Sequence, residues 1–134
     1  MPLNPYLTRR QCLAGIAATA TMPFRSLYSA NGKAIRGALM ILSTPYTEAG
    51  EVDYEDLAQE VAFCDQCGVQ GVVWPQNSSE QRYLSVEERV RGFEVLAAAN
   101  RGRDMVLVLG VQAQDTAGML QYAKVAESLS PDGM

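Results

Sequence analysis

The sequence of 134 residues contains no histidine. Without this residue, neither a Ser-His-Asp nor a Cys-His nucleophile system can form within the chain, and no zinc site with a histidine ligand can be built. Acid–base chemistry in this chain must therefore use carboxylate, tyrosine, lysine or cysteine side chains.

Cysteine is scarce as well, because Cys12, Cys64 and Cys67 are too few for a disulfide framework. Cys64 and Cys67 have C-x-x-C spacing, but they fall at the end of a predicted helix, whereas the active pairs of thioredoxin-like proteins begin one. We interpret them as small side chains packed under the helix rather than as a redox site. We also expect no metal and no cofactor.

Positive charge is limited too: 11 Lys and Arg stand against 15 Asp and Glu, for a formal net charge of −4. The basic residues form no cluster in the sequence, so we expect no nucleic-acid partner. With 48% hydrophobic and 19% charged residues, the composition is that of a globular protein with one modest domain.

The first 30 residues differ from the rest of the chain. Arg9 and Arg10 precede a short, weakly apolar run over residues 14–20, which ends in small residues at 18–20. A basic, an apolar and a small-residue part in this order are typical of a secretory signal. The run is too short to span a bilayer, which takes roughly 20 apolar residues, and the paired arginines resemble a twin-arginine signal.

We therefore predict a twin-arginine-like signal peptide and linker over residues 1–30. The protein is then expected to be bacterial and exported, periplasmic or otherwise extracytoplasmic, and to meet the membrane only during export. A frayed amphipathic helix with two incidental arginines is the alternative.

From residue 34 onward, apolar runs alternate with amphipathic segments. The runs predict buried strands, near residues 37–43, 71–75 and 105–110. The amphipathic segments predict helices, near residues 53–67, 85–99 and 115–129. Capping residues precede the helices, namely Asp53, Ser85 (with Glu88 in a capping box) and Asp115 or Thr116. This alternation indicates βαβ units and a parallel sheet.

Two architectures fit this α/β pattern, the N-terminal half of a (β/α)₈ TIM barrel and an open doubly wound sheet. The polar loops follow strands, where both kinds of enzyme place their sites. We favour the barrel, with βα units 1–3 and the start of strand 4 over residues 34–134. In a barrel segment, the strands follow one another in order and the helices lie on one side of the sheet.

Several motifs stand in a fixed order along residues 35–134. They are found at residues 37–53, 68–73, 84–89 (Leu-Ser-Val-Glu-Glu-Arg), 108–116 and 131–134. Together they resemble the first half of the dihydrodipicolinate synthase and N-acetylneuraminate lyase family. The resemblance implies a TIM barrel and a divergent family member of which this chain is the N-terminal part.

The resemblance also implies a class I aldolase-type lyase, which cleaves or forms carbon–carbon or carbon–oxygen bonds. In the family, a late barrel lysine forms a Schiff base with pyruvate or a related 2-oxo acid, and a tyrosine after the fourth or fifth strand relays protons. Neither the Schiff-base lysine nor the relay tyrosine of the family matches a position in this sequence. Its two lysines are Lys33, in the predicted linker, and Lys124, on the third predicted helix. We expect the fragment alone to be inactive, and the full-length parent to bind a small 2-oxo acid as a homo-oligomer.

The family's carboxylate-binding loop, Gly-Thr/Ser-Thr-Gly-Glu, aligns with residues 76–80. Asn77 replaces the first hydroxyl residue, Ser78 keeps the second, and Ser79 replaces a glycine. Asn77 can donate to a carboxylate but cannot relay a proton as a hydroxyl does. The resemblance thus implies substrate-binding residues Asn77, Ser78 and Ser79.

Thr44 and Trp74 are candidate pocket residues, since Thr44 follows the first predicted strand and Trp74 lies at the end of the second. Trp74 would either stack on a ligand or plug the mouth of the barrel.

Two other classes of function stay open, a non-catalytic exported binding protein on the same barrel and a small α/β interaction module. A lysine at the end of a sixth strand and a tyrosine after the fourth or fifth would favour the enzyme.

Residues 1–36 fused to a reporter protein should carry it across the membrane by the twin-arginine route. Replacing Arg9 and Arg10 together by lysine should stop export, because the arginine pair is the recognised feature of such signals. The measurement is the fraction of reporter outside the cytoplasm. Unchanged export of the double variant, or no export with the native leader, would contradict the prediction.

Overall fold

Short parallel strands form the sheet of this chain in a computed structural model that describes residues 31–134. The strands are β1 (Leu39–Ile41), β2 (Gly71–Trp74) and β3 (Val106–Leu109). They are hydrogen-bonded in the order β1-β2-β3. An isolated parallel bridge also joins Val108 of β3 to Gly133. The signal peptide predicted over residues 1–30 lies outside the described residues.

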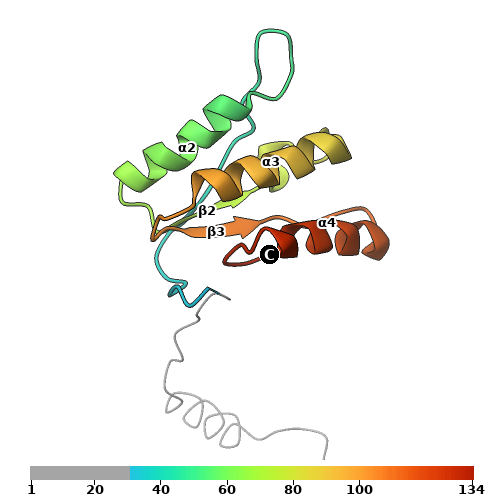
Figure 1. The fold of residues 1–134 in the computed structure, drawn as a ribbon. Helices are drawn as coiled ribbons and strands as arrows, with labels where there is room; N and C mark the ends of the chain where they lie inside the picture. The colour runs from blue at the N-terminus through green and yellow to red at the C-terminus, as the bar shows by residue number, and fades with distance from the viewer. Residues whose placement is uncertain (1–30) are drawn as a thin grey trace, which may run out of the picture.

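Each strand is followed by a helix, and the helices share one side of the sheet (Figure 1). They are α2 (Tyr54–Gln66), α3 (Val86–Ala99) and α4 (Thr116–Ser128), and a short 3₁₀ helix, η1 (Asn77–Ser79), follows β2. This arrangement corresponds to the N-terminal part of a TIM barrel, whereas a doubly wound sheet carries helices on both faces. The predicted parallel βα repeats are confirmed, although the strands are shorter than predicted.

The helices begin at the capping residues expected from the sequence. Ser85 accepts a hydrogen bond from the Glu88 N–H at 3.1 Å, and the Glu88 carboxylate accepts one from the Ser85 N–H at 2.7 Å. This reciprocal pair is a capping box. Asp53 caps α2, and Asp115 caps α4 by accepting from the Gly118 N–H at 2.8 Å. Of the two candidates for the third cap, Asp115 is therefore the capping residue.

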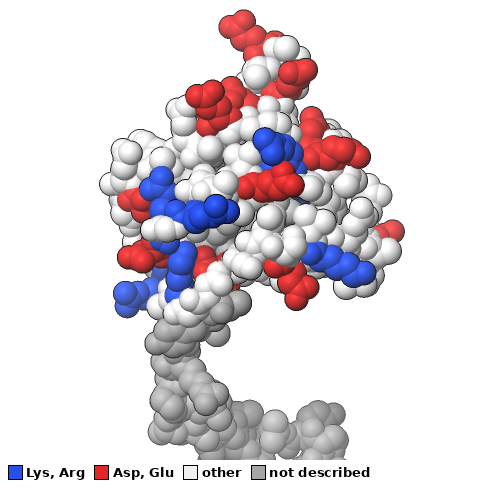
Figure 2. Space-filling model, viewed as in Figure 1, with Lys and Arg blue, Asp and Glu red and all other residues white. Residues whose placement is uncertain are grey.

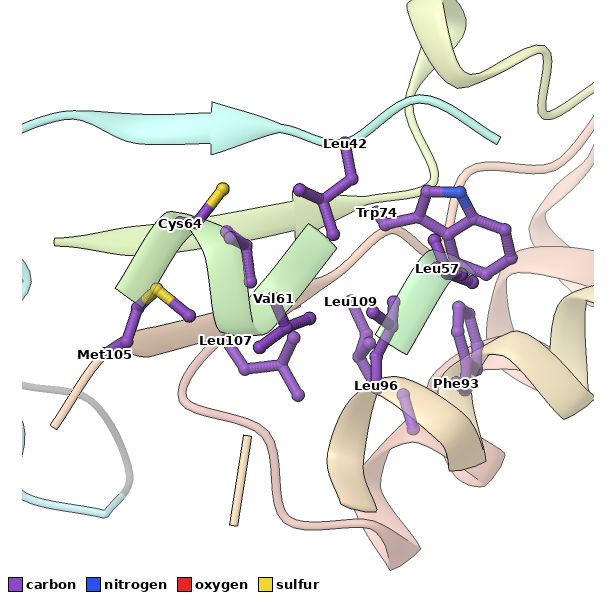
Figure 3. Packing of buried hydrophobic residues seen from close by; sticks show 12 residues of the cluster. Leu42, Leu57, Val61, Cys64, Trp74, Phe93, Leu96, Met105, Leu107 and Leu109 are labelled. Atoms are coloured by element: carbon purple, nitrogen blue, oxygen red, sulfur yellow. The ribbon is translucent and has the colours of Figure 1, made fainter. Parts of the chain in front are cut away.

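The core lies between the sheet and the helices. The buried side chains that face the helix layer are those of Leu42, directly after β1, and of the alternate strand residues Val72, Trp74, Leu107 and Leu109. Figure 3 shows Leu42 and Trp74 pointing from the strands toward the helices. The Trp74 and Phe93 rings meet edge to face, with centroids 6.2 Å apart, an arrangement that aromatic pairs favour.

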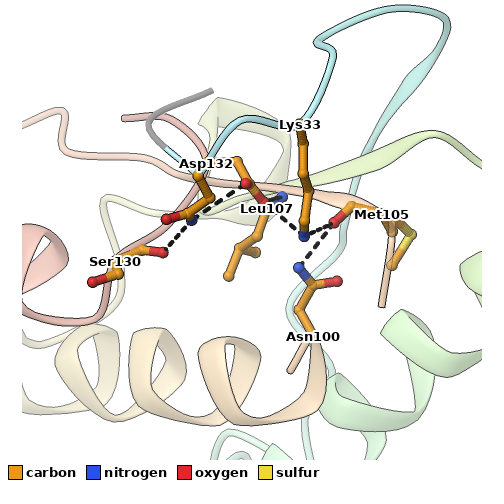
Figure 4. A network of polar contacts seen from close by, with 7 residues as sticks. Lys33, Asn100, Met105, Leu107, Ser130 and Asp132 are labelled. Carbon is orange, nitrogen blue, oxygen red and sulfur yellow. Dashed lines mark hydrogen bonds and ion pairs between the residues drawn. The ribbon is translucent and has the colours of Figure 1, made fainter. Parts of the chain in front are cut away.

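A network of polar contacts lies at the edge of the sheet where the strands begin (Figure 4). Asp132, which precedes Gly133, accepts hydrogen bonds from the Leu107 N–H at 2.9 Å and from Lys33 Nζ at 3.2 Å. Lys33 also donates to the Met105 carbonyl at 2.9 Å, and Asn100 donates to the same oxygen at 3.0 Å. The sequence suggested that Lys33 belongs to a polar linker. In the structure, its side chain instead ties the start of the described residues to the beginning of β3.

Acidic and basic side chains lie next to one another on the face shown in Figure 2. Among the described residues, ion pairs join Arg91 to Glu94 and Arg103 to Asp65. Within residues 31–134, no helix is both long and apolar enough to cross a membrane.

Replacing Gly92 by alanine should lower the free energy of unfolding by about 1–2 kcal/mol. A glycine-to-alanine change inside a helix normally stabilises by about 0.5–1 kcal/mol. At Gly92, however, the added Cβ would collide with the Trp74 indole, and overfilling a packed core costs about 1–3 kcal/mol. Denaturant titration of the full chain gives the measurement.

The exposed residue Ala98 on the same helix provides the control. Ala98→Gly should destabilise by about 1 kcal/mol through helix propensity alone. If Gly92→Ala were more stable than the unchanged protein, the tight contact between Gly92 and Trp74 would be refuted.

Candidate functional site

The loops after β1, β2 and β3 meet at the edge of the sheet where the strands end. The Gly110 N–H donates to the Trp74 carbonyl at 2.9 Å, which holds the end of β3 against the end of β2. A Cβ at Gly110 would overlap the carbonyl oxygen of Pro75, so the close approach of the two loops requires a glycine there. In parallel α/β folds this edge carries the functional residues.

Ser79 anchors the loop after β2 to β1. Its side chain has no exposed surface. The Ser79 hydroxyl donates to the Leu42 carbonyl at 2.6 Å and accepts from the Gln76 N–H at 3.0 Å. A ligand cannot reach a hydroxyl that is buried and engaged in this way. Ser79, which the alignment placed among the substrate-binding residues, therefore holds the loop in place from behind.

Thr44 extends this buried network toward the core. Its hydroxyl donates to the Ser79 carbonyl at 2.6 Å and accepts from Trp74 Nε1 at 3.0 Å. The Trp74 side chain is 0% exposed and faces the helix layer. The two roles predicted for Trp74, stacking on a ligand and plugging the mouth of the barrel, are therefore both wrong. Trp74 is a core residue. Thr44 and Trp74 support the loop.

Asn77 and Ser78 are, like Glu80, exposed residues of this loop. Their backbone N–H groups open the η1 turn, where a helix leaves its first donors without internal partners, and they donate to no acceptor within residues 31–134. Asn77 Oδ1 accepts a hydrogen bond from Gln81 Nε2 at 2.9 Å. Of the three predicted substrate-binding residues, the structure thus brings Asn77 and Ser78 to the surface together.

The neighbouring Gln76 is tied to the loop after β3. Gln112 Nε2 donates to Gln76 Oε1 at 2.8 Å. This bond links the two loops through their side chains, in addition to the backbone bond of Gly110.

Arg89 lies directly beneath these loops and was not singled out as a site residue from the sequence. It is 3% exposed, and its Nη2 donates to the Gly110 carbonyl at 2.7 Å and to Gln81 Oε1 at 3.3 Å. The guanidinium carbon lies 4.1 Å from the centre of the Tyr122 ring. Burial lowers the pKa of Arg89, while the neighbouring Tyr122 acts in the opposite direction.

The sequence did contain a signal for Arg89. It stands four positions before the apolar residue Phe93, a spacing that puts both side chains on one face of a helix, and Phe93 lies in the core.

A cavity of about 490 Å³ opens beside Arg89, between the loops and α4. Its lining is mostly polar and includes Gln81, Arg82, Gln112 and Tyr122. Among residues 31–134, no group of three or more His, Cys, Asp or Glu side chains is placed to hold a metal ion.

Tyr46, in the loop after β1, lies close to Glu80, which ends the loop over residues 76–80. Burial, the negative charges of Glu80 and Glu88 and a hydrogen bond with Glu80 all raise the pKa of Tyr46. Tyr46 is therefore a neutral phenol at neutral pH, able to donate a hydrogen bond to Glu80.

The lysines of the chain lie elsewhere. Lys33 is bound at the opposite edge of the sheet, where the strands begin. Lys124 is exposed on α4. Neither lysine reaches the loops described above.

Replacing Ser79 by alanine should destabilise the protein by about 1–3 kcal/mol, because the Leu42 carbonyl and the Gln76 N–H lose their partner in a buried place. The matched control is Ser78→Ala, which alters an exposed side chain and should change stability by less than about 0.5 kcal/mol. Denaturant titration of both variants provides the comparison. Equal stability of the two would refute the anchoring role of Ser79.

Comparisons with known proteins agree on one family. The family model described as "Dihydrodipicolinate synthetase family" matches residues 34–134. A 4-hydroxy-tetrahydrodipicolinate synthase from Methanosarcina mazei is 31% identical over 98 residues, covering 73% of this chain and 33% of the relative. The chain thus spans about a third of the length of the curated relatives it matches.

Solved structures give the same result. The crystal structure of dihydrodipicolinate synthase from Aquifex aeolicus aligns with a TM-score of 0.69 at 25% identity, over 74% of this chain and 33% of that one. An N-acetylneuraminate lyase from Mycoplasma synoviae aligns with a TM-score of 0.65 at 25% identity, over 70% and 33% of the two chains.

Proposed function

This chain belongs to the dihydrodipicolinate synthetase family, and from this we propose that it forms the first part of the barrel of an aldolase-type lyase. The substrate is pyruvate or a related 2-oxo acid, and the full protein works as a homo-oligomer. The role of the described residues is to bind the carboxylate of the substrate.

The exposed pair Asn77 and Ser78 is the observation that carries this proposal. Two backbone N–H groups without an internal partner, one amide and one hydroxyl lie together at the end of β2. Groups of this kind satisfy the oxygens of a carboxylate. The Ser79 anchor fixes the backbone on which these donors stand, so the donors are in position before a ligand arrives.

The amine that forms the Schiff base belongs, in this proposal, to a later strand of the barrel. A lysine becomes nucleophilic when desolvation or a nearby positive charge favours its neutral form. Lys33 has the opposite surroundings, since it is paired with the Asp132 carboxylate. Lys124 is exposed to solvent on α4. The chain described here thus contributes recognition, and another part of the protein contributes the nucleophile.

We place this activity outside the cytoplasm, because the leader pattern around Arg9 and Arg10 is typical of exported proteins.

The test is to incubate the full-length protein with pyruvate, reduce it with borohydride and locate the adduct by mass spectrometry. We expect one reduced pyruvate adduct per chain, on a lysine other than Lys33 and Lys124. The Lys33→Arg and Lys124→Arg variants should be labelled as fully as the unchanged protein, and residues 34–134 alone should not be labelled.

A stoichiometric adduct on Lys124 would overturn the division of roles between recognition and nucleophile. Pyruvate binding without any adduct would instead favour a binding protein built on the same barrel. No binding of pyruvate at all would overturn the proposal.

A further inference from the structure

We propose that Gln81 and Arg89 are positioning residues, which orient the side-chain amide of Asn77 so that it offers its NH₂ group to the carboxylate of a 2-oxo acid. The inference rests on the proposed function and deepens it, because it names how this loop selects an anion.

A chain of hydrogen bonds runs from the interior to the loop. Arg89 Nη2 donates to Gln81 Oε1 at 3.3 Å, and Gln81 Nε2 donates to Asn77 Oδ1 at 2.9 Å. A guanidinium carries donors only. Arg89 therefore requires the Gln81 oxygen to face inward, which turns the Gln81 NH₂ group outward to Asn77. Asn77 must then present its oxygen to Gln81, and its NH₂ group points away from Gln81.

Arg89 is held firmly enough to impose this direction. It is 3% exposed, its Nη2 also donates to the Gly110 carbonyl at 2.7 Å, and the Tyr122 ring lies against the guanidinium. Within residues 31–134 no carboxylate forms an ion pair with it. A positive charge without an ionic partner thus stands two hydrogen bonds from Asn77, which favours a negatively charged ligand there.

The Asn77 NH₂ group is available for this role. It donates to no acceptor within residues 31–134, while the Asn77 oxygen is engaged by Gln81. Together with the N–H groups of Asn77 and Ser78, the loop presents donors toward the ligand. A carboxylate carries acceptors only and matches such a set, whereas a neutral ester of the same acid matches it poorly.

The experiment compares pyruvate with methyl pyruvate, in which the carboxylate is replaced by a neutral ester. Dissociation constants are measured by calorimetry on the full-length protein and its Gln81→Met variant, which keeps the length of the side chain but cannot donate to Asn77. Gln81 is half-buried, so the variant should fold. We expect pyruvate to bind about 3- to 10-fold more weakly, as the loss of one oriented hydrogen bond implies, and methyl pyruvate to be unaffected within about twofold.

Two further variants sharpen the result. Gln114→Met is the matched control, because Gln114 is exposed and lines the cavity beside Arg89 that Gln81 also lines. The Gln114→Met variant should bind both ligands as the unchanged protein does. Gln81→Glu replaces the donor by an acceptor and should turn the Asn77 NH₂ group toward itself, so it should weaken pyruvate binding more than Gln81→Met does.

The outcomes separate this inference from the proposed function. Unchanged pyruvate binding in Gln81→Met, or an equal loss for pyruvate and methyl pyruvate, would overturn the positioning role and leave the proposed function standing. Failure of the unchanged protein to bind pyruvate would overturn both.

Discussion

The candidate site depends on one buried contact, the Ser79 hydroxyl between β1 and the loop after β2. It satisfies the Leu42 carbonyl and the Gln76 N–H together, and the Ser79 carbonyl is bound in turn by Thr44. Thr44 also receives the indole N–H of Trp74, whose ring is packed in the core. Because close-packed interiors transmit small displacements, the position of the exposed donors is coupled through Ser79 to the packing of the core.

The two edges of the sheet differ in whether their buried charges have an ionic partner. Where the strands begin, Lys33 and Asp132 neutralise each other and bind backbone groups of β3. Where the strands end, Arg89 is buried without an ionic partner among the described residues. Burying such a charge is costly, and the Gly110 carbonyl and the Tyr122 ring offset only part of that cost. A ligand that brings negative charge to this edge would offset more of it.

Local patterns were sufficient to predict most of the fold, whereas the site depended on contacts between distant residues. The caps Asp53, Ser85 and Asp115 act within one helical turn, so the sequence around each contains the whole signal. Lys33 was misplaced because its partner Asp132 stands 99 positions later. Trp74 belongs to a continuous apolar run, which does not reveal the face that each residue takes. The role of Ser79 could not be predicted, because its hydroxyl binds Leu42, 37 positions earlier.

In the loop over residues 76–80, the amides Gln76 and Asn77 replace a glycine and a hydroxyl residue of the family motif. Each amide carries a donor and an acceptor and can be turned either way, so neighbouring groups must fix which of the two faces a ligand. Gln76 and Gln112 bind each other, but no further hydrogen bond fixes which way their amides point. Gln112 Oε1 is buried without a partner among the described residues. Reversing both amides would preserve the bond between them. Asn77 differs, because its chain of hydrogen bonds ends at a guanidinium that cannot accept. In the proposed function, selectivity for an anion therefore depends on Asn77, and a substitution that interrupts its connection to Arg89 removes the fixed direction of its amide.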